Sequence, residues 1–435
     1  MAASVGEKVS VPSPAADPGL LESPTATPTT PSLLSAQPNG GFQAWLQIAG
    51  SFCLYFNTWG LVSSFGTFQA IYETGVLSAH GQFEISIIGS LQIFLMVFLS
   101  FLTGPIFDSG YCRTLLTVGS VFVVVGTLAQ SFCTNLWQFL LSQGVLVGIG
   151  AGCLNIPSVA IPSQWFTTQL PIANGIAASG SGLGGVILPI VVRRLNNQIG
   201  LRWSVRVVAL ILFVLLVVAN VVLRPRNPSG QQKRRSLVDR TAFTDWPYVL
   251  FVMGCFVVFL GLYTPFTFGQ SYALSEKIVE EGFAFYLLAI LNSSSILGRI
   301  LPMMAAPKLG AMNMVTITAM LLGITGLSLM AATSTARLLV VIVFYGFFAG
   351  TFFALLPTVI ARSTSNPATI GTRFGMAFAL FSIANLFGPP IAGALLDRLG
   401  YDAAWIWAGT VLLIGAWIQA LARTTKVGWT IKHVV

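Results

Sequence analysis

The sequence predicts an all-α polytopic membrane protein, with twelve transmembrane helices in two six-helix bundles related by a pseudo-twofold axis. Three observations lead to this prediction. The chain of 435 residues is 55% hydrophobic and 8% charged, whereas soluble domains carry about 25% charged residues. Apolar stretches recur with the length of one bilayer crossing. Glycines and prolines of the first half recur at a fixed distance in the second half.

A polar tail precedes the first apolar stretch. Residues 1–38 contain seven prolines and many Ser, Thr and Ala. Such a segment buries too little apolar surface to offset the entropy of ordering, so residues 1–40 are expected to form a disordered cytoplasmic tail. The tail has no basic start followed by an apolar core, so it does not match a cleaved signal peptide. The first helix is therefore expected to direct the chain to the membrane.

Twelve apolar segments follow, each with about 20 residues, the helix length that crosses roughly 30 Å of hydrocarbon. Because lipid offers no hydrogen-bond partners, a chain crossing it must satisfy its own backbone N–H and C=O groups, which favours helices. The segments lie at 44–69, 85–106, 114–133, 136–157, 170–192, 203–223, 246–269, 284–304, 311–332, 336–360, 371–396 and 403–422.

The positions of Lys and Arg predict the orientation and the division of the chain. With the N-terminus inside, the inner segments hold fourteen Lys and Arg residues and the outer segments hold seven. Basic residues resist translocation, so both termini and the basic central stretch are expected in the cytoplasm. The predicted domains are an N-terminal bundle at 41–223, a linker at 224–245, a C-terminal bundle at 246–423 and a cytoplasmic tail at 424–435.

A shift of 200 residues superimposes markers of the first half on the second half. Since six helices per unit is an even number, both copies enter the membrane in the same direction, and a binding site is expected between them near the midplane. The matching pairs are Gly110 with Gly310, Gly150 with Gly350, Pro157 with Pro357, Gly175 with Gly375, and Pro189 with Pro389.

Motifs for catalysis, metal binding and nucleotide binding are absent from the sequence. It has no H-E-x-x-H, G-x-S-x-G or P-loop pattern, and its five cysteines lack metal-site spacing. Gly180, Gly182 and Gly185 match G-x-G-x-x-G, but they lie inside a predicted membrane helix, where small residues serve close packing. Lys and Arg form no patch suited to nucleic acid. We expect no enzymatic activity, no cofactor, no metal and no nucleic-acid partner.

The loop after the second segment reads GPIFDSGYCR at 104–113. It resembles the signature loop G-x-x-x-D-R-x-G-x-R of the major facilitator superfamily, with Ser109 in place of the first Arg. Further stretches resemble the fungal branch of its monocarboxylate-porter family: QGVLVGIGAG at 143–152, ANGIAASGSGLGG at 173–185, LGRILP at 297–302 and TRFGMAFALFSIANLFGPPIAG at 372–393. The resemblance covers most of residues 40–423 and implies a carrier that works by alternating access.

Two departures from the family pattern bear on proton coupling. Animal members carry a Lys in the first helix and an Asp one turn before the Arg of the eighth. This chain has no Lys between Lys8 and Lys233, and Ser295 stands one turn before Arg299. All thirteen acidic residues lie in tails, loops or helix ends, so the sequence identifies no proton-coupling carboxylate inside the membrane.

The predicted function is secondary active transport of a small organic anion, such as a monocarboxylate or a secondary metabolite with a carboxylate. Two alternatives stay open, a nutrient sensor on the same fold and a carrier of a non-carboxylate metabolite or vitamin. A channel would need rings of polar or charged residues, which the sequence lacks. The lipid bilayer is the other partner, and a monomer in the plasma membrane is expected.

Polar residues on apolar helices are the candidate lining of the transport cavity. Each has the alternative role of joining neighbouring helices by a hydrogen bond, worth about 0.6 kcal/mol. They are Asn57, Asn155, Tyr263, Asn292, Ser295 and Asn385.

Arg299 is the one charged residue well inside an apolar segment. A charge there costs about 2.5–3.5 kcal/mol and usually faces a bundle interior or a cavity. Its guanidinium suits a carboxylate, since the two groups form parallel hydrogen bonds, and the resemblance points to the same residue. The alternatives are that Arg299 extends to the inner headgroups or bonds helix carbonyls.

Three charged residues are candidates for gating at the inner face. Asp108 ends the second segment and Arg373 begins the eleventh, so opposite charges on the two halves are expected to meet there. Arg113 belongs to the same signature loop as Asp108. The alternative is that Asp108 only caps its own loop.

Overall fold

The computed structural model describes Ala2 and residues 39–166, 170–226, 237–284, 286–364 and 370–427. Contacts divide the chain into Met1–Gln37 and Pro38–Val435, and every described helix belongs to the second unit. The predicted disorder of residues 1–38 and the middle of the predicted linker lie outside the described residues.

The first bundle is built from helices that run up to Val222. Its first crossing is interrupted by a π-helical turn, and its last two crossings both lie within α8, on either side of a kink at Gly200. The elements are α1 (Phe42–Tyr55), η1 (Phe56–Gly60), α2 (Leu61–Ser63), α3 (Phe65–Thr74), α4 (Gln82–Asp108), α5 (Cys112–Gln130), α6 (Leu136–Phe139), η2 (Leu140–Val147), α7 (Gly148–Trp165) and α8 (Leu170–Val222).

A short 3-10 turn at the end of the linker precedes the second bundle. The elements are η3 (Arg240–Thr244), α9 (Trp246–Leu262), α10 (Thr264–Ser275), α11 (Glu281–Ala284), α12 (Tyr286–Leu309), α13 (Ala311–Ser328), η4 (Leu329–Ala331), α14 (Thr335–Ser363), α15 (Ile370–Leu399) and α16 (Tyr401–Val427).

Ten helical stretches of the described chain are long and apolar enough to cross a membrane. One of them, Ile172–Val222, is divided into two crossings by a non-helical residue at Gly200. Phe42–Thr74 adds another crossing, whose α-helices are short because the π-helical turn separates them. The described residues therefore form the predicted twelve crossings and contain no strand, although several helices extend beyond the predicted ends.

Glycines at equivalent junctions reflect the internal repeat. Gly200 has φ 79° where the fifth crossing turns into the sixth, and Gly400 has φ 84° between α15 and α16. Gly110 and Gly310, with φ 90° and 83°, occupy the turns after α4 and α12. Glycine adopts positive φ without a steric cost, so it suits these tight turns. The members of each pair are 200 residues apart, which is the predicted spacing of the repeat.

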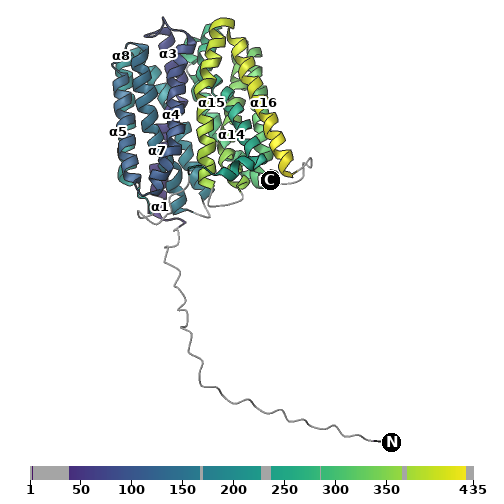
Figure 1. The fold of residues 1–435 in the computed structure, drawn as a ribbon. Helices are drawn as coiled ribbons and strands as arrows, with labels where there is room; N and C mark the ends of the chain where they lie inside the picture. Colours follow the sequence, from purple (N-terminus) through teal and green to yellow (C-terminus); the bar gives the residue numbers. More distant parts are fainter. Residues whose placement is uncertain are drawn as a thin grey trace. The chain divides into compact units, whose positions relative to one another are not determined.

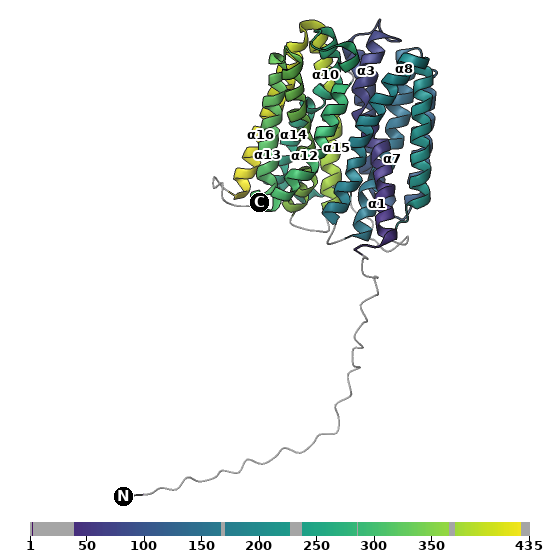
Figure 2. The same cartoon turned by 180° about the vertical axis from the view of Figure 1, so that it is seen from behind.

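The two ends of this helical unit differ in what they carry. The linker end holds the start of α1, the end of α16 and the described ends of the linker (Figure 1). The distal end holds the turns after α3 and α10. Figure 2 shows the same arrangement from behind, with α1 reaching the linker end beside α7.

The outer surface of the helical unit carries apolar side chains, which agrees with the low content of charged residues. Apolar side chains recur every three to four residues along the outer face of the sixth crossing, and each is about half exposed. They are Leu210, Phe213, Val217 and Val221, with exposed fractions of 60%, 49%, 43% and 70%. An apolar surface of this kind is stable in lipid and not in water.

The bundles meet through three pairs of crossings, α4 with α15, α8 with α12, and α3 with α10. Close approach depends on small residues. A Cβ added at Gly66 of α3 would lie 2.1 Å from the carbonyl oxygen of Phe266, so the backbones of α3 and α10 touch. Arg299 and Asn292 on α12 and Asn385 on α15 therefore belong to helices of this interface.

Candidate functional site

Trp59 and Asn155 begin the candidate site on the side of the first bundle. The indole Nε1 of Trp59 donates to Asn155 Oδ1 at 2.8 Å, and Asn155 Nδ2 donates to Ser100 Oγ at 2.9 Å. Trp59 belongs to the π-helical turn of the first crossing, and such turns are frequent at functional sites. The bonds join the first, second and fourth crossings at one point.

Aromatic rings of the second bundle face Trp59. The Phe353 ring centroid lies 6.3 Å from that of Trp59, 6.0 Å from Tyr263 and 6.2 Å from Phe259. Phe259 lies in turn 5.0 Å from Phe381. The site thus has an apolar, aromatic wall formed by α9, α14 and α15, opposite a polar wall of the first bundle.

Arg299 lies between these walls. Its Nη1 donates to the Ala178 carbonyl oxygen at 3.1 Å and to Ser181 Oγ, both on α8 of the other bundle. Its guanidinium carbon is 5.8 Å from the Phe353 ring centroid, a distance that permits a cation–π interaction. The helices that carry Arg299 and Phe353 approach closely, because a Cβ at Gly298 of α12 would lie 1.9 Å from the Phe347 carbonyl oxygen of α14.

The guanidinium of Arg299 has no carboxylate partner among the described residues. Its Nε is buried and without a hydrogen-bond acceptor in that part of the chain. Tyr55 and Tyr263 lie near enough to interact electrostatically with it. The side chain points across the interface to α8, which disfavours the interpretation that Arg299 extends to the headgroups. Its bond to the Ala178 carbonyl does match the interpretation that it bonds helix carbonyls.

The other predicted lining residues occupy different surroundings. Asn292 donates to the Gly185 carbonyl at 3.2 Å and so joins α12 to α8. Ser295 is 2% exposed, on the face where α14 touches α12. Asn57 donates to its own helix at the Cys53 carbonyl. The Oδ1 atoms of Asn57 and Asn385 are buried without a donor among the described residues.

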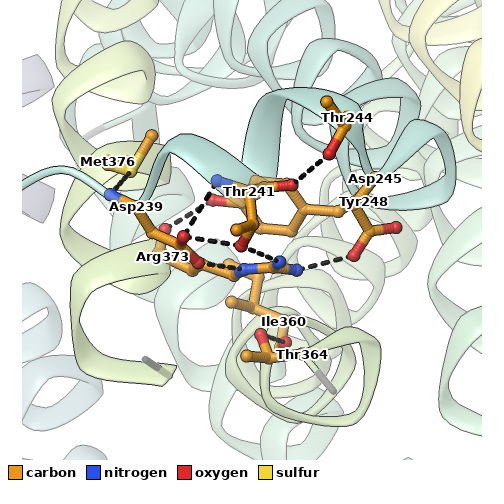
Figure 3. Close-up of polar contacts among 9 residues, drawn as sticks. All are labelled: Asp239, Thr241, Thr244, Asp245, Tyr248, Ile360, Thr364, Arg373 and Met376. Carbon is orange, nitrogen blue, oxygen red and sulfur yellow. Dashed lines mark hydrogen bonds and ion pairs between the residues drawn. The ribbon is translucent and has the colours of Figure 1, made fainter. Parts of the chain in front are cut away.

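Arg373 is held at the linker end by two carboxylates that were not expected to contact it (Figure 3). Its Nε donates to Asp239 at 2.9 Å and its Nη1 to Asp245 at 2.6 Å. The Tyr248 hydroxyl donates to the Arg373 carbonyl at 2.6 Å. Hydrogen bonds from Thr241 and Arg373 lower the pKa of Asp239. This cluster, the linker clasp, fastens the end of the linker to α15.

Asp108 and Arg113 are the other two gating candidates, and neither is shown to contact Arg373. The side chain of Asp108 lies outside the described part of the chain, so its contact with Arg373 stays a prediction. That contact would have to share a guanidinium already bonded to Asp239 and Asp245. Arg113 donates through Nη1 to the Asn220 carbonyl, which ties α5 to the end of α8.

The distal end of the interface is closed. The Asp397 carboxylate of α15 accepts hydrogen bonds from the backbone N–H groups of Gln82 and Phe83 at 3.0 and 3.1 Å. These are the first residues of α4, so a carboxylate of one bundle caps a helix of the other. A cavity of about 10 Å³, lined by Ser86, Ser90 and Tyr263 among others, lies between the bundles. It has room for about one water molecule.

A family model described as Major Facilitator Superfamily matches residues 48–336 of the chain. The chain belongs to the major facilitator superfamily. Relatives with known names align with this chain over most of its length. The MFS-type transporter dbaD of Emericella nidulans is 38% identical over 409 residues, 93% of this chain and 92% of that protein. The aspyridones efflux protein apdF of Emericella nidulans is 36% identical, over 87% of this chain and 78% of its own length.

Further comparisons extend the agreement. The fujikurins efflux protein of Gibberella fujikuroi is 33% identical, over 92% of this chain and 85% of that protein. A solved POT family transporter shares the fold with a TM-score of 0.71 at 14% identity, over 89% of this chain and 98% of its own. The nucleoside transporter NupG gives a TM-score of 0.67, also at 14% identity. The protein is thus a facilitator-superfamily transporter and not an enzyme.

Sequence reasoning missed several residues of the site in this facilitator. Trp59, Tyr55 and Phe353 were not among the predicted lining residues, nor was Ser181, which accepts from Arg299. Tyr55 and Trp59 do have the i, i+4 spacing that places two side chains on one helix face. With 32 Phe, 10 Trp and 9 Tyr in the sequence, such a spacing alone does not distinguish a site from ordinary packing.

Proposed function

We propose that this protein exports an amphipathic metabolite that carries a carboxylate or a similar acidic group. The observation that supports this most is Arg299, a partly buried cation whose buried Nε has no acceptor and which has no carboxylate partner in the described chain. Leaving a charge buried and unpaired is costly, so an anion entering the site would gain a strong, charge-assisted hydrogen bond.

The aromatic wall suits the apolar part of such a solute. The Phe353 ring lies against the Arg299 guanidinium, and the rings of Trp59 and Tyr263 lie beside Phe353. These rings offer faces for stacking against a flat or conjugated skeleton. Relatives named as efflux proteins for aspyridones and fujikurins support export over uptake. The proposed location is the plasma membrane, with the linker end and both termini in the cytoplasm.

Alternating access supplies the mechanism of this proposal. The bundles rock about the interface, so that the site opens first at the linker end and then at the distal end. The cytoplasmic anion enters at the linker end and binds Arg299. In the conformation described here the distal end is closed by contacts between α4 and α15 and between α3 and α10.

Flux of carboxylated aromatic metabolites into inside-out vesicles tests this proposal. Arg299→Lys keeps the charge but loses the planar fork, so transport is expected to fall at least tenfold. Arg299→Ala is expected to abolish transport while the protein stays in the membrane. Arg206→Lys is the matched control, because Arg206 also contacts a serine hydroxyl and two aromatic rings, at the distal end.

Two outcomes would contradict the proposal. Normal flux and apparent affinity in Arg299→Lys would show that Arg299 does not bind the anion through its fork. Absence of flux for every solute in the unsubstituted protein would favour the nutrient sensor on the same fold.

A further inference from the structure

Glu73 lies at the distal end, where the two bundles touch. It is the next-to-last residue of α3 in the first bundle. One carboxylate oxygen, Oε2, accepts a hydrogen bond from Ser271 Oγ of α10 at 2.8 Å. This bond crosses from one bundle to the other, a few residues beyond the backbone contact between Gly66 and Phe266. The environment of Glu73 therefore exists only while the distal end is closed.

The second oxygen of Glu73 and a neighbouring amide oxygen are both buried acceptors without a donor. Glu73 Oε1 is buried and has no donor among the described residues, and the same holds for Gln69 Oε1. Gln69 and Glu73 are four residues apart on α3, so they share a face, and Gln69 lies within hydrogen-bonding reach of the carboxyl. The Nε2 of Gln69 already donates to Gln82 Oε1 at 3.1 Å.

The groups that face Glu73 from the neighbouring helices do not neutralise it. α4 presents the Gln82 side chain, α10 presents Ser271, and α15 presents the Asp397 carboxylate. α16 presents Tyr401, which also interacts electrostatically with Glu73. The Asp397 carboxyl accepts from two N–H groups of α4, so an ionised Glu73 would face a second acidic group across the interface.

We propose that Glu73 is a proton-binding site that couples closure of the distal end to the pH on that side of the membrane. With Glu73 protonated, its Oε1–H donates to Gln69 Oε1, and both buried acceptors are satisfied. When the distal end opens, the carboxyl returns its proton to water on the distal side and is hydrated as the anion. One O–H bond of the carboxyl breaks and one O–H bond forms on the water molecule that accepts the proton.

The direction in which pH on the distal side changes closure of the distal end follows from the proposal. A proton that binds the closed conformation more tightly than the open one favours closure by the same free energy. Acid on the distal side therefore keeps the distal end closed, and alkali favours opening. This inference uses the alternating access proposed above, but the separation of the bundles can be measured without any solute. A protein that transports nothing could still support it.

Spin labels on the distal loops measure that separation in the full chain. Cysteines introduced at Ser78 in the first bundle and Ser334 in the second, both exposed, carry nitroxides for distance measurement by electron paramagnetic resonance in nanodiscs. The chain without introduced cysteines gives the labelling background of its own five. We expect the short-distance population to fall at least twofold from about pH 5 to about pH 9, with the steepness of one proton.

Glu73→Gln separates this site from other titrating groups. Its amide is neutral and can donate to Gln69 as the protonated acid does, so the distances are expected to stay short at every pH. Glu84→Gln is the matched control at the same end, because Glu84 is exposed and pairs with His80. It is expected to follow the unsubstituted protein.

A second variant serves if Glu73→Gln does not fold. Gln69→Leu removes the acceptor for the bound proton and is expected to move the transition to lower pH. Distances independent of pH in the unsubstituted chain would overturn the proposal, and would mean that Gln69 and Gln82 turn their amides to donate to an ionised Glu73. The proposal also fails if Glu73→Gln, or Gln69→Leu where that variant is used, keeps the unsubstituted pH profile.

Discussion

Arg299 and Trp59 show what single residues contribute to the candidate site. Arg299 stands out in the sequence because a charge inside an apolar membrane helix costs free energy and usually faces a bundle interior or a cavity. Trp59 does not stand out, since a tryptophan in a membrane helix is ordinary. Its importance comes from one hydrogen bond, which orients Asn155 and positions the indole ring against Phe353.

Trp59→Phe tests that hydrogen bond. The phenyl ring keeps most of the aromatic surface but removes the Nε1–H, which leaves Asn155 Oδ1 without its donor. An unsatisfied buried acceptor costs about 1–3 kcal/mol, so apparent affinity for the solute is expected to fall about tenfold. Concentration-dependent flux in vesicles measures this change.

Trp165→Phe is the control for that experiment. The Trp165 indole also donates to an oxygen, the Arg224 carbonyl at 3.2 Å, but it lies at the linker end away from the site. Solute flux in the Trp165→Phe variant is expected to stay near that of the unsubstituted protein. Equal losses in both variants would show that Trp59 matters only for folding.

At the scale of elements, the linker clasp connects a short 3-10 turn to a long membrane helix. η3 and the start of α9 supply Asp239 and Asp245, and α15 supplies Arg373 (Figure 3). Because the pKa of Asp239 is lowered in the folded protein, this stabilisation is present above the ordinary carboxyl value of about 3.9. It is lost as the pH falls through the lowered value.

Arg373→Gln is expected to release η3 from α15. Removing the guanidinium leaves two partly buried carboxylates unpaired, and breaking a buried pair costs about 3–5 kcal/mol. Trypsin is expected to cleave after the exposed Arg240 at least tenfold faster in this variant. Gel analysis of cleavage at neutral pH measures the rate.

Arg362→Gln controls for the loss of a positive charge at the same end. Arg362 lies in the last turn of α14 and takes no part in the clasp. Its cleavage rate at Arg240 is expected to match that of the unsubstituted chain. A normal rate in Arg373→Gln would mean that other contacts hold the linker.

The whole molecule depends on two bundles that enter the membrane in the same direction. The positive-φ glycines at 110, 200, 310 and 400 mark the same two turns in each bundle. The distal contacts of Asp397 and Glu73 and the linker-end contacts of Arg373 then lie at opposite ends of these helices. Rocking of the bundles would break contacts at one end while those at the other form.

Thiol labelling on intact cells tests the proposed orientation of this molecule. Cysteines introduced at Ser4 in the tail and Ser229 in the linker are expected to resist an impermeant reagent, because both sites are proposed to be cytoplasmic. A cysteine at Ser78 of the distal loop is expected to react. Labelling of the Ser4 or Ser229 variant in intact cells would show that the orientation is opposite to the one proposed. Labelling in permeabilised cells is the control that each thiol is reactive.

The sequence by itself determined the class of fold and the family of this protein. Low charge and apolar segments of bilayer length are enough for this, because lipid permits almost no backbone structure other than helices. The repeat was also visible, since turns that need positive φ keep glycine at a fixed spacing. The sequence also identified Arg299 as a candidate site residue. The free-energy cost of placing its charge in the membrane depends on the apolar segment around it and not on distant partners.

Tertiary structure decided which side chains from distant parts of the chain meet. The clasp of Arg373 with Asp239 and Asp245 and the contact of Glu73 with Ser271 join residues that lie 128 to 198 positions apart. Arg299 and Phe353 meet from two different helices. No local period records such pairs. They depend on the rotation of each helix and on glycines that let backbones touch, and both follow from the packing of the whole molecule.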